Sequence, residues 1–481
     1  MKNMNRRSFI KSTALGAAAI SLPARSWAQV AGANNDIRLA VVGFKGRGGD
    51  HIRGLGSVPG VRLTALCDVD SSVLEGGVKR LKDTGKEVEG FTDIRKLLES
   101  KNVDVISIAT PNHWHSLATI WAVQAGKDVY LEKPISHNVS EGRRAVEIAR
   151  KHNRIVQAGT QSRSSLAGIK EAVAWVRAGN LGKILISRGL CYKRRGSIGK
   201  VDGPQPIPPQ VDYELWCGPA LKLPLMRKNL HYDWHWVWNT GNGDLGNQGI
   251  HEMDVARWFL GVNELPPRIF SYGGRVGYVD DGETPNTQVI YHDYPGAPLI
   301  FEVRGLPSKT DSMQMDKYKG ADIGIVIDCE GGYVTVPSYT RAVAYDKDGK
   351  QIKEWKDGQN HYANFIKAVR SRKVEDLNSD ILEGHLSSAL CHTGNISYYL
   401  GKKTSPDELR EKIKGDKDMS ETFGRMAEHL AANGVDVAKD LMTLGVVLKM
   451  DPKTERFIGN DKANELLTRP YRPGFVVPAK A

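Results

Sequence analysis

The chain has 481 residues, of which 40% are hydrophobic and 25% charged, and it contains 50 glycines. This composition is typical of a globular protein and excludes fibrous, low-complexity and membrane-spanning classes. At roughly 150 residues per domain, the length predicts two or three domains.

The formal net charge is +12, but part of it belongs to the N-terminal segment. Residues 1–28 hold no acidic residue and five basic ones: Lys2, Arg6, Arg7, Lys11 and Arg25. Without them the charge falls by five to +7, and the other basic residues are scattered except at 193–195. No nucleic-acid-binding module is recognisable, so we expect no nucleic-acid partner. The five cysteines lack zinc-binding and paired spacing and predict neither a metal site nor a disulfide framework.

Residues 1–28 have the layout of an export signal. Arg6 and Arg7 are followed by Ser-Phe-Ile-Lys, which is close to the twin-arginine pattern. The apolar run that follows is about eleven residues long and too short to span a bilayer, and it ends at a small-x-small cleavage site, 26–28. An uncleaved amphipathic helix is the alternative. We predict a cleaved twin-arginine signal peptide, a periplasmic or other extracytoplasmic location, and no integral membrane segment after cleavage.

A glycine-rich turn follows the first predicted strand, residues 37–42, whose apolar run is typical of a buried parallel strand. Gly43 and Gly48 match the first and third glycines of G-x-G-x-x-G, whereas Lys45 occupies the second position and Gly46 follows it. Such glycines let the backbone approach a pyrophosphate at the start of a helix. We therefore predict dinucleotide binding by Gly43, Gly46, Arg47 and Gly48.

The second predicted strand, 63–67, ends at Asp68, which is 25 residues beyond Gly43. An acidic residue at this place bonds the adenosine ribose in dinucleotide-binding folds. Because Asp70 is close by and no arginine is adjacent, the pattern favours NAD over NADP. A helix N-cap is the other role that Asp68 can have.

Three more strands are predicted at 103–109, 128–131 and 154–158, with helices at 116–125 and 140–152 between them. Ligands bind at the carboxyl ends of strands in such sheets. The residues at those ends that we assign to the cofactor are Thr110, Pro111, Asn112, His115, Glu132, Lys133 and Gln161.

The motif Glu132-Lys133-Pro134, preceded by Thr110-Pro111-Asn112, makes the chain resemble the glucose-fructose oxidoreductase / inositol dehydrogenase (Gfo/Idh/MocA) family. The segments 384–392 and 467–472 look like its exported bacterial members, so the resemblance covers nearly the whole chain. It implies an α/β protein with a doubly wound parallel Rossmann domain, 29–160, and an α+β domain with an open, mostly antiparallel sheet, 161–401. It also implies an active site between the two domains and a homo-oligomer.

Strand-like stretches at 183–192, 287–292, 299–303, 323–329 and 333–336 agree with the second domain. Residues 402–481 are predicted to form a C-terminal helical extension. Phe423, Met426 and Leu430 share one face of an amphipathic stretch there, which we expect to pack on the body of the protein or on another subunit.

Oxidation of a secondary alcohol needs a base for the hydroxyl proton and a cation that steadies the developing alkoxide. The resemblance assigns Lys133 to the place beside the nicotinamide, bonded to the reacting hydroxyl. Residues 241–254 look like the family's Asp-x-x-x-His segment, with Asn247 and His251 at the matched positions. His251 is the candidate base. Asn247 cannot carry a charge, so it can orient a hydroxyl or His251 but not relay a proton, and Asp244 is a substitute acid.

The substrate is predicted to be a carbohydrate, because Trp234, Trp236 and their aromatic neighbours in 231–238 can support apolar sugar faces. Core packing is the alternative for these rings. His231 and His235 have the spacing of a helical metal pair, but no carboxylate fits, and we expect no metal. The basic run 193–195 can bind an anionic sugar group or lie in solvent. The remaining predicted substrate contacts are Arg163 and Tyr192.

Three functions remain open at this point. The first is an NAD(P)-dependent oxidoreductase acting on a secondary hydroxyl of a sugar, glycoside or polyol, with a tightly bound cofactor because no free NAD exists outside the cytoplasm. The second is an NAD-dependent redox-neutral glycosidase that oxidises, eliminates and re-reduces. The third is a non-catalytic sugar-binding protein.

Overall fold

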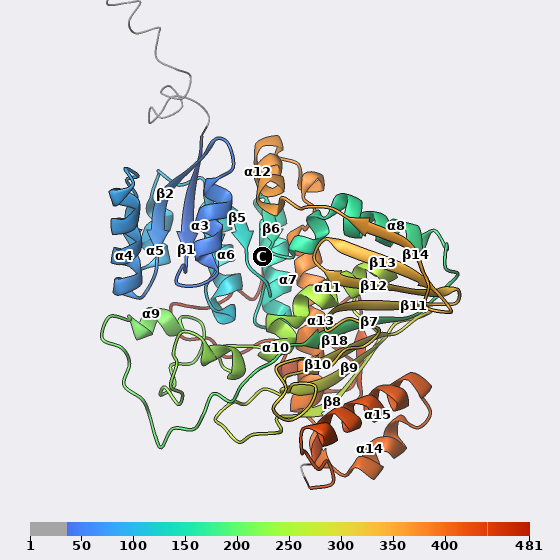
Figure 1. Ribbon diagram of the computed structural model, residues 1–481. Helices are drawn as coiled ribbons and strands as arrows, with labels where there is room; N and C mark the ends of the chain where they lie inside the picture. Colours follow the sequence, from blue (N-terminus) through green and yellow to red (C-terminus); the bar gives the residue numbers. More distant parts are fainter. Residues whose placement is uncertain (1–35, 440) are drawn as a thin grey trace, which may run out of the picture.

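The computed structural model describes residues 36–439 and 441–481, so the predicted signal peptide lies outside the described residues. Two sheets organise this part of the chain (Figure 1). The strands of the first are β1 (Ile37–Val42), β2 (Val61–Cys67), β3 (Glu89–Phe91), β4 (Val105–Ile108), β5 (Asp128–Leu131) and β6 (Val156–Ala158).

The first sheet has the order β3-β2-β1-β4-β5-β6, and every pair in it is parallel. This is the order of a doubly wound dinucleotide-binding sheet, which confirms the predicted class. Only β3 was not expected from the sequence. The helices that connect the strands of the first sheet are α3 (Gly48–Gly56), α4 (Ser71–Asp83), α5 (Ile94–Glu99), α6 (His115–Gln124) and α7 (Val139–Lys151).

Strand β1 shows why both faces of this sheet are covered. Leu39 and Val41 point into one hydrophobic cluster, and Ala40 and Val42 point into another, as the alternation of side chains along a strand requires. The first cluster includes Leu55 of α3, and the second includes residues of α5, α6 and α7. A strand that is buried on both faces has apolar residues at nearly every position, and this pattern is the one that predicted β1.

The second sheet is larger and mostly antiparallel, with one parallel pair, β7–β10. Its main path runs β14-β13-β12-β11-β7-β10-β9-β8-β16-β15, and β17 pairs with β8 and β18. The strands are β7 (Ile184–Tyr192), β8 (Arg268–Gly274), β9 (Thr287–Asp293), β10 (Leu299–Arg304), β11 (Ile323–Cys329), β12 (Gly332–Ser338), β13 (Arg341–Asp346), β14 (Gln351–Lys356), β15 (Lys402–Thr404), β16 (Met442–Leu444), β17 (Leu448–Asp451) and β18 (Arg456–Phe457).

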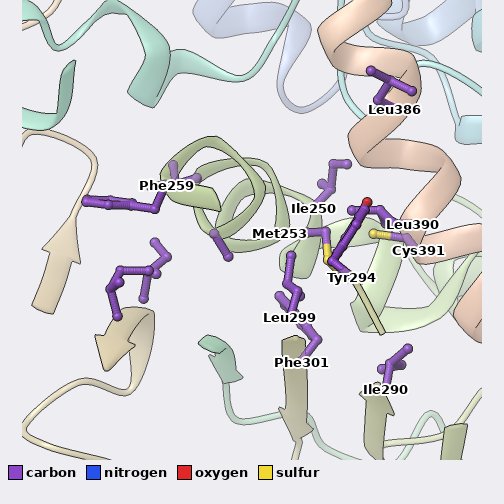
Figure 2. Packing of buried hydrophobic residues seen from close by; sticks show 14 of the residues in the cluster. Ile250, Met253, Phe259, Ile290, Tyr294, Leu299, Phe301, Leu386, Leu390 and Cys391 are labelled. Atoms are coloured by element: carbon purple, nitrogen blue, oxygen red, sulfur yellow. The ribbon is translucent and has the colours of Figure 1, made fainter. Parts of the chain in front are cut away.

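Helices cover both faces of this sheet. Figure 2 shows Met253 of α11 beside Leu390 of α13, with Phe301 of β10 facing them. On the opposite face, Phe423 of α15 packs with Tyr272 of β8. The helices that follow the first sheet in the chain are α8 (Glu171–Arg177), α9 (Tyr213–Cys217), α10 (Gly243–Asn247), α11 (Gly249–Leu260), α12 (His361–Ser371), α13 (Ile381–Tyr399), α14 (Pro406–Ile413), α15 (Lys417–Ala432) and α16 (Asp461–Glu465). Short 3₁₀ or π turns are η1 (Asn112–Trp114), η2 (Gln161–Ser164), η3 (Leu166–Lys170), η4 (Asp233–Trp236) and η5 (Val374–Asp376).

The predicted helical extension over 402–481 differs from the structure. Helices α14 and α15 are present, and Phe423, Met426 and Leu430 pack on the body, but β15, β16 and β17 add strands to the second sheet beside β8. These strands are only three or four residues long, too short to show a period in the sequence.

Segments distant in sequence complete the first domain. Phe365 and Ile366 of α12 belong to the same hydrophobic cluster as Leu39 and Val41 of β1, so part of the core around the first sheet comes from a segment that follows β14 of the second sheet. Residues 467–481, which we call the tail, also return to it: Phe475 is 5% exposed and lies edge-on to Trp114, with ring centroids 5.7 Å apart.

Residues 193–242, which we call the covering segment, join β7 to α10. The tail binds this segment. Arg472 donates to the main-chain oxygens of Glu214 (3.0 Å) and Gly218 (3.2 Å), and Arg469 donates to the side chain of Asn239 (2.8 Å). The covering segment, with α9, lies below the first sheet in Figure 1. The tail therefore ties it to the first domain.

All five cysteines are buried and unpaired. Among residues 36–439 and 441–481, no helix combines the length and the apolar character that crossing a membrane requires.

Replacing Phe475 by Ala is expected to lower the free energy of unfolding by about 3 kcal/mol, because it empties an aromatic site against Trp114. Val476→Ala is the matched control, since Val476 is 54% exposed. Denaturant unfolding followed by tryptophan fluorescence measures both. Equal stability of the two variants would contradict the anchoring role of the tail.

Candidate active site

The glycine turn after β1 has the geometry that a dinucleotide site requires. Gly43 has φ +73°, and a Cβ there would lie 3.0 Å from the backbone of Thr110. A Cβ at Gly48 would lie 2.0 Å from the oxygen of Gly43, so this glycine lets α3 start close against β1. A Cβ at Gly46 would meet nothing within 4 Å. The first two glycines are thus needed by the fold, and the third faces open space.

A cavity of about 520 Å³ opens at this turn and runs to Lys133 and Asn247. Its wall contains every residue assigned to the cofactor except Gly48 and Gln161. Gly48 lies under the turn, and Gln161 donates to Tyr130 Oη (3.3 Å) and Glu132 Oε1 (3.4 Å) from outside the wall. The carboxyl ends of β1, β2, β4 and β5 thus meet at one elongated cavity.

Asp68 lies in this wall rather than capping a helix. Its carboxylate accepts from the main-chain nitrogens of Phe44 (3.0 Å) and Asp70 (3.1 Å), and burial raises its pKa. The N-cap of α4 is Asp70, which accepts from Ser72 (3.0 Å) and Val73 (3.3 Å). Asp68 is therefore available to a ribose.

Two buried polar atoms in the wall have no hydrogen-bond partner within the described residues: Thr110 Oγ1 and Asn112 Nδ2. Buried polar groups are normally paired, so unpaired ones in a cavity wall indicate a ligand that completes them. Together with the glycine turn and Asp68, they fit a dinucleotide.

Glu132 organises the deep end of the cavity. It accepts from Arg47 Nε (2.9 Å) and contacts His51 Nε2 (3.0 Å). Burial by itself raises the pKa of this carboxyl, but the His51 hydrogen bond and the charges of Lys133 and Arg47 hold it well below its usual range. The charged carboxylate thereby holds Arg47 in place.

His115 connects two of the loops that form the wall. Its Nδ1 lies 2.5 Å from Pro134 O and its Nε2 lies 2.8 Å from Thr110 O. One imidazole therefore lies between the loop after β4 and the loop after β5, with its single N–H directed to one of the two carbonyls.

Lys133 bridges the two domains, because its Nζ donates to the main-chain oxygen of Asn247 (2.9 Å). Burial lowers the pKa of Lys133. Asn247 is the last residue of α10, and α11 begins at Gly249, so the residue that holds the lysine lies at a helix junction in the cavity wall.

His251 lies one turn further along α11 and is 7% exposed. Its ring centroid is 4.9 Å from that of Tyr339, and its Nδ1 has no partner among the described residues. Burial, and then the charge of Lys133, hold its pKa well below the usual range. The imidazole is therefore neutral at pH 7.

His235 is a second neutral imidazole, which sequence reasoning considered only as a metal ligand. It lines the cavity, stacks on Trp234 with centroids 3.6 Å apart, and its Nδ1 lies 2.5 Å from Tyr232 O. A carbonyl oxygen only accepts, so the proton is on Nδ1 and Nε2 is an acceptor. Burial lowers its pKa to about 3. His231 instead contacts Asp70 (3.0 Å).

Two of the predicted substrate contacts, Arg163 and Tyr192, do not line the cavity. Arg163 is 6% exposed and bonds Asp254 (2.8 and 3.0 Å), and Tyr192 is buried with its hydroxyl on Glu302 (2.7 Å). Both follow or end strands, but their side chains point into packed interfaces rather than the cavity.

The two predicted tryptophans differ in position. Trp234 lines the cavity, whereas Trp236 does not and lies under Arg195, whose guanidinium carbon is 5.2 Å from the centroid of the ring. Arg195 also binds both oxygens of Asp244 (2.7 and 2.8 Å), so Asp244 is not a free acid.

A polar cluster beside His251 was not predicted from the sequence. Gln248 accepts from Lys193 Nζ (2.7 Å) and donates to Glu252 Oε1 (3.1 Å) and Tyr339 Oη (3.3 Å). Burial raises the pKa of Glu252 to about 8. The spacing of Gln248 and Glu252 on one helical face was the available signal, but nothing in the sequence indicated that Lys193 and Tyr339 join them.

Two family models match adjacent parts of the chain. One, described as an oxidoreductase family with an NAD-binding Rossmann fold, matches residues 37–160, and the other, its C-terminal alpha/beta domain, matches 169–296. Together they cover more than half of the chain. The chain belongs to the Gfo/Idh/MocA oxidoreductase family. Membership identifies the first domain as the NAD-binding one and the second as the family's own C-terminal domain.

Curated members of the Gfo/Idh/MocA family match over part of their length. Glycosyl hydrolase family 109 protein 2 from Shewanella sp. (strain ANA-3) is 28% identical over 163 residues, 29% of this chain and 36% of that protein. Inositol 2-dehydrogenase 1 from Saccharopolyspora erythraea is 36% identical over 130 residues, 26% of this chain and 37% of that protein. The chain thus matches about a third of the length of these relatives.

Solved structures share the fold over a longer stretch. WlbA dehydrogenase from Bordetella pertussis, in complex with NADH and UDP-GlcNAcA, has a TM-score of 0.53 at 21% identity, covering 74% of this chain and 94% of that one. Aldose-aldose oxidoreductase from Caulobacter crescentus, complexed with glycerol, has a TM-score of 0.55 at 17% identity, covering 75% and 98%.

Gly43→Ala is expected to lower the free energy of unfolding by about 2 kcal/mol, because the new Cβ meets Thr110 in a left-handed backbone conformation. Gly46→Ala should melt like the wild type, since its Cβ meets no protein atom within 4 Å. Thermal unfolding of both variants, with the NAD content of each purified protein, provides the measurement. Equal melting temperatures would contradict the geometry of the turn.

Proposed function

We propose that this protein is an NAD-dependent oxidoreductase that oxidises a secondary hydroxyl of a sugar, glycoside or polyol and keeps its cofactor bound. One observation carries the proposal: a single cavity runs from the glycine turn to Lys133 and Asn247, with neutral His251 one turn beyond. The name of the inositol dehydrogenase relative supports a ring hydroxyl as the reacting group.

NAD bound along the cavity would accept the hydride from the substrate carbon. The protein has to hold the substrate hydroxyl and remove its proton. Lys133, held by Asn247 O, has further N–H groups with which to bond that hydroxyl and stabilise the oxygen as negative charge develops. His251 accepts the proton, because burial keeps its imidazole uncharged.

The covering segment supports a retained cofactor. Asp212 donates its main-chain N–H to Val69 O (3.0 Å), Ser71 donates to Gln210 O (2.9 Å), and His231 reaches Asp70. Trp216 and Trp234 of this segment line the cavity. A dinucleotide enclosed in this way leaves slowly, which suits the extracytoplasmic location that we propose from residues 1–28. Asp68 supports NAD over NADP.

The glycosyl hydrolase family 109 names support a second candidate, a redox-neutral glycosidase. Such an enzyme would release the aglycone from a glycoside and yield no oxidised sugar. The same Lys133 and His251 would act on the ring hydroxyl, so product analysis separates the two candidates.

The decisive test is mass spectrometry of the small molecules released when the purified protein is denatured. We expect stoichiometric NAD in the wild type and in Lys133→Met, because the lysine lies at one end of an extended cavity. On addition of sugars, glycosides and polyols, the wild type should develop reduced-nicotinamide absorbance, and Lys133→Met should do so about 1000-fold more slowly.

The outcomes separate the candidates. Oxidised sugar supports the dehydrogenase, and released aglycone without oxidised sugar supports the glycosidase. A protein that holds no nucleotide and binds none at millimolar NAD would overturn both and leave a sugar-binding protein.

As the pH is lowered, kcat/KM should begin to fall only below pH 6. A base whose pKa is lowered from 6.5 stays unprotonated as the pH falls, so activity persists where an ordinary histidine would already be protonated. Rates of nicotinamide reduction between pH 5 and 8 measure this.

His251→Asn should lose at least about 100-fold in kcat, and a larger loss in His235→Asn would assign the base to His235 instead.

A further inference from the structure

The basic run 193–195 separates into three different environments. Arg195 is neutralised by Asp244, and Arg194 is exposed and contacts Met313 Sδ (2.8 Å). Lys193 is half-buried, and its Nζ donates to Gln248 Oε1 at 2.7 Å. Only Lys193 of the three is turned toward the cluster beside His251.

Lys193 and Lys133 are held by neighbouring residues. Lys133 Nζ bonds the main-chain oxygen of Asn247, and Lys193 Nζ bonds the side-chain oxygen of Gln248. Within the described part of the chain, no carboxylate lies within 4.0 Å of either ammonium group. Two cations at one helix junction thus have amide oxygens as partners.

Nearby carboxyl groups do not balance this charge. Glu132 is already bonded by Arg47 and His51. Glu252 is 2% exposed and its Oε2 has no partner in the described residues, and burial raises its pKa to about 8, so most of it is protonated at pH 7. Asn247 contributes no charge. Lys193 and Gln248 adjoin Asn247 at the edge of the cavity wall, and there the cations Lys133, Lys193 and Arg47 outnumber the one ionised carboxylate, Glu132.

We propose that Lys193 binds the carboxylate of an anionic sugar, a uronic or aldonic acid or its glycoside, while Lys133 holds the reacting hydroxyl. This inference rests on the proposed function and specifies its substrate class. An ammonium group whose charge no neighbouring carboxylate neutralises matches one negative charge on the substrate. A phosphate dianion is bound best by several donors or a bidentate arginine, and the arginine that is nearest in sequence, Arg195, is committed to Asp244.

The test compares Lys193→Gln with Arg194→Gln, which removes the same charge one residue away from an exposed side chain. Each purified protein is titrated calorimetrically with methyl β-D-glucuronide, methyl β-D-glucoside and glucose 6-phosphate, and with the galacto forms of the first two. Reduction of the bound nicotinamide is followed with the same compounds. Thermal unfolding confirms that both variants are folded.

We expect the wild type to bind a uronide at least about 10-fold more tightly than the matching glycoside, and Lys193→Gln to lose that preference while Arg194→Gln keeps it. Equal binding of uronide and glycoside, equal effects of the two substitutions, or tightest binding of the sugar phosphate would overturn the inference. A uronide preference without nicotinamide reduction by any compound would leave the anion site standing and reject the proposed oxidoreductase.

Discussion

The hydrogen bond from Lys133 to the main-chain oxygen of Asn247 is the contact on which the site depends. Lys133 follows β5 of the nucleotide-binding sheet, and Asn247 ends α10 of the second domain, so this bond joins the two domains at the end of the cavity. Because the acceptor is a carbonyl, it positions the ammonium group without neutralising its charge. The lysine remains able to stabilise an oxygen anion.

Burial determines the charge state of the groups around this bond. Desolvation keeps His251 and His235 neutral and raises the pKa of Glu252, whereas Glu132 stays ionised because Arg47, His51 and Lys133 surround it. The result is a site with fixed cations, neutral bases and one committed carboxylate. This balance of charge is the basis for proposing a substrate that carries its own negative charge.

Enclosure of the cavity is shared by distant segments. The covering segment supplies Trp216 and Trp234 to the wall, and the tail holds that segment through Arg469 and Arg472 while Phe475 packs on Trp114, which also lines the cavity. The last residues of the chain therefore stabilise the wall that faces the nucleotide, although they do not themselves line it. Because Trp114 belongs both to this packing and to the cavity wall, the stability of the tail is linked to the shape of the cavity.

Local patterns predicted the elements whose physics is local: the buried strands, the glycine turn with Gly43 and Gly48, Asp68 at the end of β2, and Lys133 after β5. Strand β3 and strands β15–β17, at three or four residues each, carry too little pattern to be predicted. Arg163 and Tyr192 were misplaced because a strand end does not specify which way a side chain points. The sequence by itself determined the parallel nucleotide-binding domain and the cofactor end of the cavity, because strand periodicity and glycine backbone freedom act between neighbours, whereas the class of the second domain was implied by the family resemblance. Only the tertiary structure decided that Lys193, Gln248 and Tyr339 join His251, since burial and charge balance come from segments that meet after folding.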